Sequence, residues 1–270
     1  MGAIQNIPIS NRDKILMSNK DGWKDMILDE IKFHDPLFCE FSESLNKKAK
    51  AILPLTLKDQ KLINRLENQH FFRQNSISPS DRTMAICDNK KMFSDYLEKQ
   101  GFGSYLPKQK IQEPPYIIKP KTGQWGLDIH IVRSKNDEES LQHILGKASH
   151  FKQEFIEGSE EYTTHFLYHK KFYLFRTYEF GYDTNAPIKG IEMPYKFKRL
   201  INHETFRPLF EDILKSLDYQ GIGCFNYKLV DDKPKIFEMN PRFGASLCGM
   251  IDDAIEAYLF ALFERKYGLV

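Results

Sequence analysis

The 270-residue sequence has few cysteines and no long apolar run. No two of its four cysteines form a C-x-x-C pair, so neither a zinc site nor a disulfide framework is indicated for Cys39, Cys87, Cys224 and Cys248. No apolar stretch approaches the ~18 residues that span a membrane, and the first residues lack the pattern of a signal peptide. We therefore expect a cytoplasmic protein with buried, reduced thiols and no membrane partner.

The sequence also lacks an excess of either charge and two common nucleotide motifs. A net charge of +2 without a dense basic run disfavours a nucleic-acid partner. The sequence contains neither a glycine-rich dinucleotide fingerprint nor a Walker sequence ending in Gly-Lys-Ser/Thr, so it predicts neither a nicotinamide site nor a P-loop. Hydrophobic residues make up 41% of the chain and charged residues 28%, as is typical of a soluble globular enzyme with one or two domains.

The most informative segment present is IFEMNPRFG, at positions 236–244. Residues two apart on a strand share a face, so Glu238, Asn240 and Arg242 are expected to converge on one site. Pro241 fits only an edge or the end of a strand. A carboxylate and an amide oxygen are ligands for Mg²⁺, and a guanidinium can grip phosphate oxygens. The segment predicts nucleoside-triphosphate chemistry; the alternative is an ordinary strand with polar residues on its solvent face.

Residues 115–132 (PYIIKPKTGQWGLDIHIV) indicate a strand, a glycine-bearing turn and a second strand. Lys119, at the end of the first strand, can reach a phosphate as a point charge. Glycines permit positive φ and bring backbone N–H groups close to an anion, which predicts a lid over phosphates made of Thr122, Gly123, Gln124, Trp125 and Gly126. The alternative is a plain hairpin with a surface lysine, in which Trp125 only packs.

Residues 151–163 (FKQEFIEGSEEYT) indicate an extended segment from Lys152 to Ile156 that is followed by an acidic turn. Free backbone groups of such a segment can pair with the edge of adenine, and a nearby carboxylate can accept hydrogen bonds from ribose hydroxyls. Glu161 is our candidate for that carboxylate. Alternatively, it belongs with Glu157 and Glu160 to a solvated acidic turn.

These three segments, in this order and together with Lys90 in DNKKMFSDYL, resemble the ATP-grasp superfamily over about residues 85–250. The likeness is strongest to its carbamoyl-phosphate-synthase-like and carboxylate–amine ligase branch. The resemblance implies that Lys90 and Lys119 contact the phosphates of ATP, with Lys91 as a register alternative to Lys90, and that residues 122–126 form the flexible phosphate loop.

The same resemblance assigns the remaining parts of a nucleotide site. It implies that the hinge that pairs with adenine is Gln153, Glu154, Phe155 and Ile156, and that Glu161 binds ribose. The implied ligands of Mg²⁺, or of Mn²⁺ in its place, are Glu238 and Asn240, and Arg242 is the implied phosphate-binding arginine. ATP and Mg²⁺ are thus the expected cofactors.

One position departs from the family pattern. The family usually carries an acid, or sometimes Gln, about a dozen residues before the glutamate of the metal strand, where it holds a second metal ion. Counting back twelve residues from Glu238 reaches Asn226. A neutral amide can ligate through its oxygen but contributes no charge, so occupancy of a second metal site is left open. Lys228 shares that face on a regular strand and is a candidate to offset the missing ion's charge.

Arg176 and a short glycine-containing turn are further candidates. Arg176 stands among aromatic residues of an expected strand, Phe172 to Phe180, and either reaches the surface or points into the cleft. The resemblance favours the cleft, where Arg176 would hold a phosphate or the oxygens of an acyl phosphate. The Gly244-Ala245-Ser246 turn is a candidate to bind a substrate carboxylate through backbone N–H groups. His130, His165 and His169 lack metal-ligand spacing, and we expect structural roles for them.

The fold implied is α/β (α+β): an ATP-grasp fold in which two α+β subdomains, residues 87–150 and 151–270, clamp ATP behind a shortened Rossmann-like domain, residues 1–86. Hydrophobic patterning predicts strands and helices in all three regions. The expected strands include Lys14 to Met17, Ala51 to Leu55 and Leu127 to Val132. The expected helices are Trp23 to Phe33, Ser140 to Ala148, Phe206 to Leu217 and Asp252 to Tyr267.

The resemblance implies an ATP-dependent ligase that joins a small-molecule carboxylate to an amine, or to another nitrogen or a thiol nucleophile. The reaction would proceed through an acyl phosphate and release ADP and phosphate. Two alternatives are an ATP-binding module without ligase activity and a small-molecule kinase that uses the same clamp. The substrates and the oligomeric state are left open, with a homodimer as one candidate.

Overall fold

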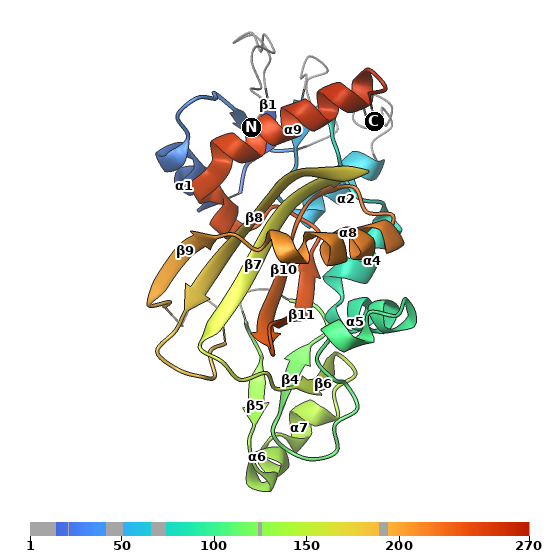
Figure 1. Cartoon of the computed structure of the whole chain (residues 1–270), viewed down its shortest axis with the longest axis vertical. Coiled ribbons are helices and arrows are strands. Elements are labelled where there is room, and N and C mark those ends of the chain that lie inside the picture. The colour runs from blue at the N-terminus through green and yellow to red at the C-terminus, as the bar shows by residue number, and fades with distance from the viewer. Residues whose placement is uncertain are drawn as a thin grey trace.

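The computed structural model describes residues 15–20, 22–41, 51–65, 74–123, 126–188 and 194–269. Three β-sheets organise these residues: a five-stranded sheet lies in the middle, a three-stranded sheet with α9 at one end, and another three-stranded sheet at the other (Figure 1). The predicted mixed α/β class is confirmed. The Rossmann-like character of the first region and the boundaries at residues 86 and 150 stay predictions.

The middle sheet is antiparallel and has the order β11-β10-β7-β8-β9. Its strands are β7 (Glu160–His169), β8 (Lys171–Gly181), β9 (Phe197–Ile201), β10 (Gly221–Val230) and β11 (Lys233–Asn240). The register places Asn226 of β10 directly between Thr163 of β7 and Glu238 of β11. Directly opposite residues point to the same face, so these three polar side chains meet.

Helices and aromatic side chains cover the opposite face of the middle sheet. The elements there are α4 (Asp81–Asp88), α5 (Lys90–Lys99), η1 (Gly103–Tyr105), η2 (Glu204–Phe206) and α8 (Arg207–Ser216). Phe210 of α8 stacks on Phe225 of β10 at 4.6 Å between ring centroids, inside a buried cluster that includes Phe93, Phe166 and Met239. This cluster leaves the polar face of β10 and β11 free to line a cavity.

The second sheet, with the order β5-β4-β6, has a small core of its own, centred on Tyr116 and Ile144. Its elements are β4 (Tyr116–Pro120), β5 (His130–Val132), α6 (Lys135–Ser140), α7 (Gln142–Leu145) and β6 (His150–Glu154). The strand predicted from Leu127 begins only at His130, because Asp128 has a positive φ of 59°. The helix predicted from Ser140 starts earlier and in two pieces, since a capping box closed by Asp137 begins α6.

The third sheet is parallel and has the order β2-β1-β3. Its elements are β1 (Ile15–Ser18), α1 (Trp23–Glu30), β2 (Leu37–Cys39), β3 (Ala51–Leu53) and α2 (Leu57–Arg65). Strands occur where they were predicted, while α1 ends three residues before the expected Phe33, and Lys14 lies outside the described residues.

The C-terminal elements η3 (Ala245–Met250) and α9 (Ile251–Lys266) pack against the third sheet. The hydroxyl of Tyr258 in α9 accepts a hydrogen bond from the Ile77 N–H at 2.7 Å and donates one to the Ile52 carbonyl at 2.8 Å. The N-terminal strands therefore share one core with the end of the chain. Over the described ranges, no helix is long and apolar enough to cross a membrane.

Candidate active site

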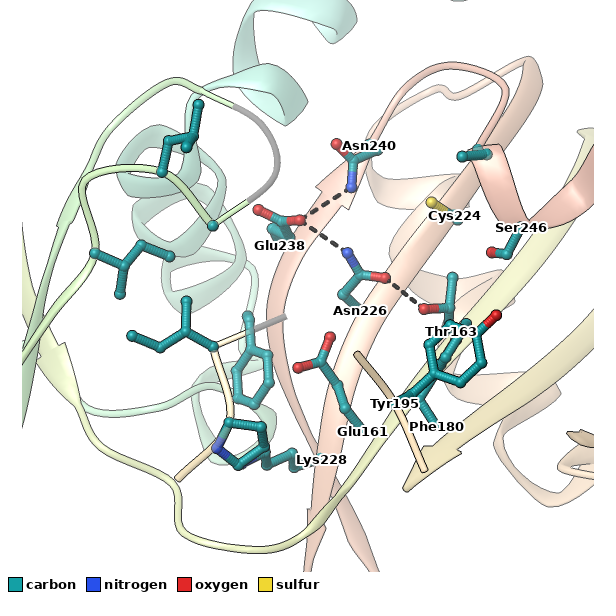
Figure 2. A pocket seen from close by; sticks show the side chains of 18 of the residues that line it. Glu161, Thr163, Phe180, Tyr195, Cys224, Asn226, Lys228, Glu238, Asn240 and Ser246 are labelled. Carbon is teal, nitrogen blue, oxygen red and sulfur yellow. Dashed lines mark hydrogen bonds between the residues drawn. The ribbon is translucent and has the colours of Figure 1, made fainter. Parts of the chain in front are cut away.

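A cavity of about 560 Å³ lies between the second sheet, the polar face of the middle sheet, and α1 with η3. Figure 2 shows part of its lining. Its lining brings together most of the residues that the sequence singled out: Lys90, Lys119, Gly123, Gly126, Glu154, Phe155, Ile156, Glu161, Asn226, Glu238, Asn240 and Arg242. The three separate sequence segments therefore form one site.

Glu238 is the carboxylate at the centre of this site. Its Oε1 accepts hydrogen bonds from the side-chain amides of Asn226 at 2.8 Å and Asn240 at 3.1 Å (Figure 2). Its Oε2 lies 3.2 Å from Nζ of Lys90. Burial opposes ionisation of this carboxyl, but the charges of Lys90 and Lys119 and the two amide bonds outweigh burial and lower its pKa to about 2. Glu238 is thus ionised at neutral pH.

Two lysines from different elements approach Glu238. Lys90, the first residue of α5, also donates to the Gly123 carbonyl at 2.8 Å and so links the helix to the predicted phosphate loop. Lys119, at 3% exposure, donates to the Phe237 carbonyl at 3.2 Å. Burial lowers the pKa of Lys119 to about 7, because Glu238 only partly offsets the loss of water. Lys91, the register alternative, instead pairs with Asp95 outside the cavity lining.

Arg242 follows β11, as the proline in the segment predicts, and its guanidinium donates to the Asn240 side-chain oxygen at 3.2 Å and to the Phe243 carbonyl at 2.9 Å. It also lies over the ring of Trp23, with 5.7 Å between the guanidinium carbon and the ring centroid. Sequence patterns could not place Trp23 here, because the contact joins residues more than 200 positions apart. The guanidinium is thus held beside the metal-ligand candidates by two neutral oxygens and an aromatic ring, which leaves its positive charge available to an anion.

The predicted adenine and ribose residues line the other end of the cavity. Glu161 is 7% exposed, so it is not the solvated surface acid of the alternative interpretation, whereas Glu160 is exposed. Phe155 and Ile156 line the same end, and their wall is completed by aromatic and aliphatic side chains that the sequence did not single out: Phe180, Tyr182, Pro187, Ile188 and Tyr195. This end offers an apolar slot with a carboxylate at its edge, which suits a nucleoside.

Lys228 does not lie beside the metal-ligand candidates as a substitute charge. Its buried ammonium donates to the carbonyls of Ile156 at 3.0 Å and Gly158 at 2.8 Å. Burial lowers the pKa of Lys228, and the nearby acids, first Glu161, oppose that shift. The lysine therefore fixes the turn that carries the hinge, and the earlier expectation that it offsets a missing metal ion is corrected.

Several predicted residues lie elsewhere. Thr122 is described but does not line the cavity, and Gln124 and Trp125 lie outside the described residues. Arg176 shares the sheet face of its cross-strand partner His165, yet it is half-exposed, lies 3.8 Å from Asp253 and does not line the cavity. The predicted position of Arg176 in the cleft is therefore corrected: β8 carries it past the cavity to the N-terminal end of α9.

The cavity continues beyond Arg242 into a region lined by α1 and η3. Asp29 and Glu30 of α1, Lys198 of β9 and Ser246 of η3 lie there. Ser246 Oγ is 2.7 Å from Nε2 of the buried His165. A Cβ on Gly244 would approach the His165 ring to 2.5 Å, so this turn requires glycine. Sequence spacing could not reveal these residues, because four separate elements contribute them.

The donor set suits one hard divalent cation. Glu238 supplies an ionised carboxylate and Asn240 an amide, and the site would be completed by phosphate oxygens and water. In the parts of the chain that the structure describes, no group of three or more His, Cys, Asp or Glu residues is arranged to hold a metal ion. One magnesium ion carried in by a nucleotide therefore fits the residues present.

Fold and site define an α/β protein with a cation-rich cleft between two sheets, of the kind that holds phosphate groups. A sequence profile described as an ATP-grasp domain matches residues 87–246, and the chain belongs to this family. The superfamily inferred from the sequence is thereby confirmed. Among curated proteins, no sequence matches this chain.

Solved structures show the same fold at low sequence identity. D-alanine–D-alanine ligase from Bacillus anthracis is 16% identical with a TM-score of 0.60, covering 93% of this chain and 98% of that one. Phosphoribosylamine–glycine ligase from Thermotoga maritima is 14% identical with a TM-score of 0.63, covering 91% and 75%. L-amino acid ligase from Bacillus licheniformis is 16% identical with a TM-score of 0.57, covering 89% and 70%. These similarities establish the fold alone.

Proposed function

We propose that this protein is an ATP-dependent ligase that joins a small-molecule carboxylate to an amine and releases ADP and phosphate. The observation that carries the proposal is the ionised Glu238 between Lys90 and Lys119, with Asn240 and Arg242 beside it. This is a set of groups that neutralises a polyphosphate and holds one divalent ion. The names of the similar structures, several of them ligases, agree with the reaction class.

The first step is phosphoryl transfer. An oxygen of the substrate carboxylate forms a bond to the γ-phosphorus of ATP, the bond to the β-phosphate oxygen breaks, and ADP leaves. Lys119, Lys90 and Arg242 would orient the phosphates and stabilise charge on the transferring oxygens. A bound Mg²⁺ on Glu238 and Asn240 would neutralise further phosphate charge. The protein contributes positioning and electrostatic stabilisation, without a covalent intermediate of its own.

The second step takes place on the α1 side of the cavity. The amine attacks the acyl carbon, the bond to the phosphate oxygen breaks, and phosphate leaves with the electron pair while the amine loses a proton. Acyl phosphates hydrolyse, so water must be excluded, and the loop containing Gly123 and Gly126 would serve as the lid. Asp29, Glu30 and Lys198 place both charge signs beyond the phosphate end of the cavity, which suits small charged acceptors.

A second candidate function is nucleotide binding without ligation. The neutral Asn226, where the family pattern usually has an acid, is the observation that favours it. A relative that has lost ligase activity would have less reason to keep Lys119, Glu238, Asn240 and Arg242 together at one site. We therefore place the ligase first.

The test is turnover of ATP with Mg²⁺ against a panel of carboxylates and amines, following ADP and free phosphate separately. Equal release of both products that requires both substrates, and that is lost in Glu238→Gln, is the expected result. ADP without free phosphate would replace the ligase by a kinase acting on a hydroxyl. Tight nucleotide binding with no turnover across the panel would favour the binding module.

A further inference from the structure

The Asn226 side chain lines the cavity and bridges two neighbouring residues. Its amide nitrogen donates to Oε1 of Glu238 at 2.8 Å, and its oxygen accepts from the Thr163 hydroxyl at 2.9 Å (Figure 2). The bridge follows from the strand register, which sets Thr163, Asn226 and Glu238 side by side across β7, β10 and β11. Thr163 itself is 3% exposed and is held within the sheet.

The orientation of this amide follows from its neighbour. Oε1 of Glu238 accepts hydrogen bonds from both asparagines and Oε2 lies 3.2 Å from the Lys90 ammonium; these are the contacts of a carboxylate, which can only accept hydrogen bonds. The Asn226 atom that faces it must therefore be the NH₂ group, which cannot ligate a cation. The Asn226 oxygen, the one atom of this side chain able to bind a metal ion, faces Thr163.

Asn240 is oriented by the same carboxylate but has a different partner. Its NH₂ group donates to Glu238 at 3.1 Å, and its oxygen accepts from Arg242 at 3.2 Å. Arg242 lines the cavity, so a phosphate that binds this guanidinium draws the donor away and frees the Asn240 oxygen. A bound phosphate would not free the Asn226 oxygen in this way, because its hydrogen-bond donor, Thr163, is part of the sheet.

The balance of charges in the cavity also favours one bound divalent ion over two. Lys90, Lys119 and Arg242 against Glu238 leave an excess of two positive charges beside the phosphates. ATP with one Mg²⁺ carries about two negative charges and balances that excess. A second Mg²⁺ would add two uncompensated positive charges next to the Lys119 ammonium, which at 3% exposure has little water to screen them.

We propose that this site binds a single divalent ion with each nucleotide, and that Asn226 is a positioning residue for Glu238 and not a metal ligand. The inference deepens the proposed ATP-dependent reaction and rests on it. It assigns one function to Thr163, Asn226 and Glu238, which form a hydrogen-bonded chain: the neutral Asn226 occupies the place where a second carboxylate would attract a second ion. Glu238 is thereby held at the geometry that the single ion needs.

The test counts Mn²⁺ bound per protein with a non-hydrolysable ATP analogue, by electron paramagnetic resonance of the free ion at concentrations well above the dissociation constants. The wild-type protein is expected to bind one Mn²⁺ per bound analogue. Asn226→Asp adds a carboxylate beside Glu238 and is expected to bind two. Asn226→Ala is expected to keep one, with an affinity for Mn²⁺ about 10-fold weaker, because removal of a group that orients a metal ligand typically has that effect.

Thr163→Val gives a matched variant in which Asn226 stays but loses its partner. It is expected to keep a count of one and to weaken Mn²⁺ binding severalfold, less than Asn226→Ala. Melting temperatures measured without metal or nucleotide control for folding. Two Mn²⁺ per analogue in the wild type, falling to one in Asn226→Ala, would overturn the inference while leaving ATP binding intact. Failure of the wild type to bind the analogue at all would overturn the proposed function itself.

Discussion

Replacing Glu238 by glutamine removes the charge that holds two lysines near each other, and the structure gives the size of the effect. The pKa of Glu238 falls from 4.5 to about 2 in the folded protein. A shift of that size corresponds to ~3 kcal/mol of the free energy of unfolding at neutral pH. Because the side chain keeps 22% exposure, solvent screens part of this interaction, and the expected loss of unfolding free energy is ~2–3 kcal/mol.

The sign of the pH dependence follows from the direction of the shift. A carboxyl whose pKa is lowered on folding stabilises the protein fully above its unfolded pKa of 4.5, and that stabilisation is lost as the pH falls through the folded value near 2. The difference in unfolding free energy between wild type and Glu238→Gln should therefore be constant from pH 6 to 7 and shrink by ~1.4 kcal/mol per pH unit below 4.5.

Urea unfolding of both proteins without ligand at pH 7 and at pH 3.5 is the assay. Glu211→Gln provides the matched control, since Glu211 pairs with Lys215 at 3.0 Å on the surface of α8, where such pairs contribute ~0.5 kcal/mol or less. We expect a loss of ~2–3 kcal/mol for Glu238→Gln and almost none for the control. Equal losses in the two variants, or a difference that does not shrink at pH 3.5, would refute the electrostatic account of Glu238.

Three further predictions follow from the same contacts. Lys119 must be protonated to hold phosphate, and its pKa is about 7, so nucleotide affinity should fall by up to tenfold per pH unit above pH 7. Isothermal titration calorimetry at pH 6 and 8 measures this dependence, which Lys119→Met should flatten. Glu161→Ala should weaken nucleotide binding by roughly 10-fold and leave the melting temperature nearly unchanged, and an unaltered dissociation constant would remove Glu161 from the ribose site. Tyr258→Phe should lower the free energy of unfolding by ~2 kcal/mol in urea denaturation, because the Ile77 N–H and the Ile52 carbonyl lose their buried partner; an effect below ~0.5 kcal/mol would mean that both groups find other partners.

The end of the cavity around Glu238 was predictable because its residues are close in sequence or lie on regular strands. Glu238, Asn240 and Arg242 follow a period of two, and the structure places all three at the cavity. Lys119 at the end of β4 and Lys90 at the start of α5 were marked by their places in short strand and helix patterns. Periodicity is a local property of the backbone, so sequence alone reveals it.

Residues whose positions depend on packing between elements were not predictable in the same way. Arg176 has the pattern of a site residue, but the packing of α9 against β8 brings it to Asp253 outside the cavity. Lys228 lies on the predicted face, yet the path of the 157–159 turn brings carbonyls to its ammonium. The end of the cavity beside α1 combines Asp29 with Ser246 of η3. No sequence periodicity links these two residues, because they belong to separate elements.

The packing also suggests which parts of the site move together. Trp23 of α1 lies under Arg242 and packs against Phe243, with 6.0 Å between the two ring centroids, inside the core that α9 shares with the third sheet. The α1 wall of the cavity and Arg242 thus belong to one packed unit. The second sheet has a separate core around Tyr116. It can therefore move toward the middle sheet and bring Lys119 with it, without repacking the α1 wall of the cavity. We therefore expect acceptor preference to follow changes on α1, and the rate of phosphoryl transfer to follow changes in the second sheet.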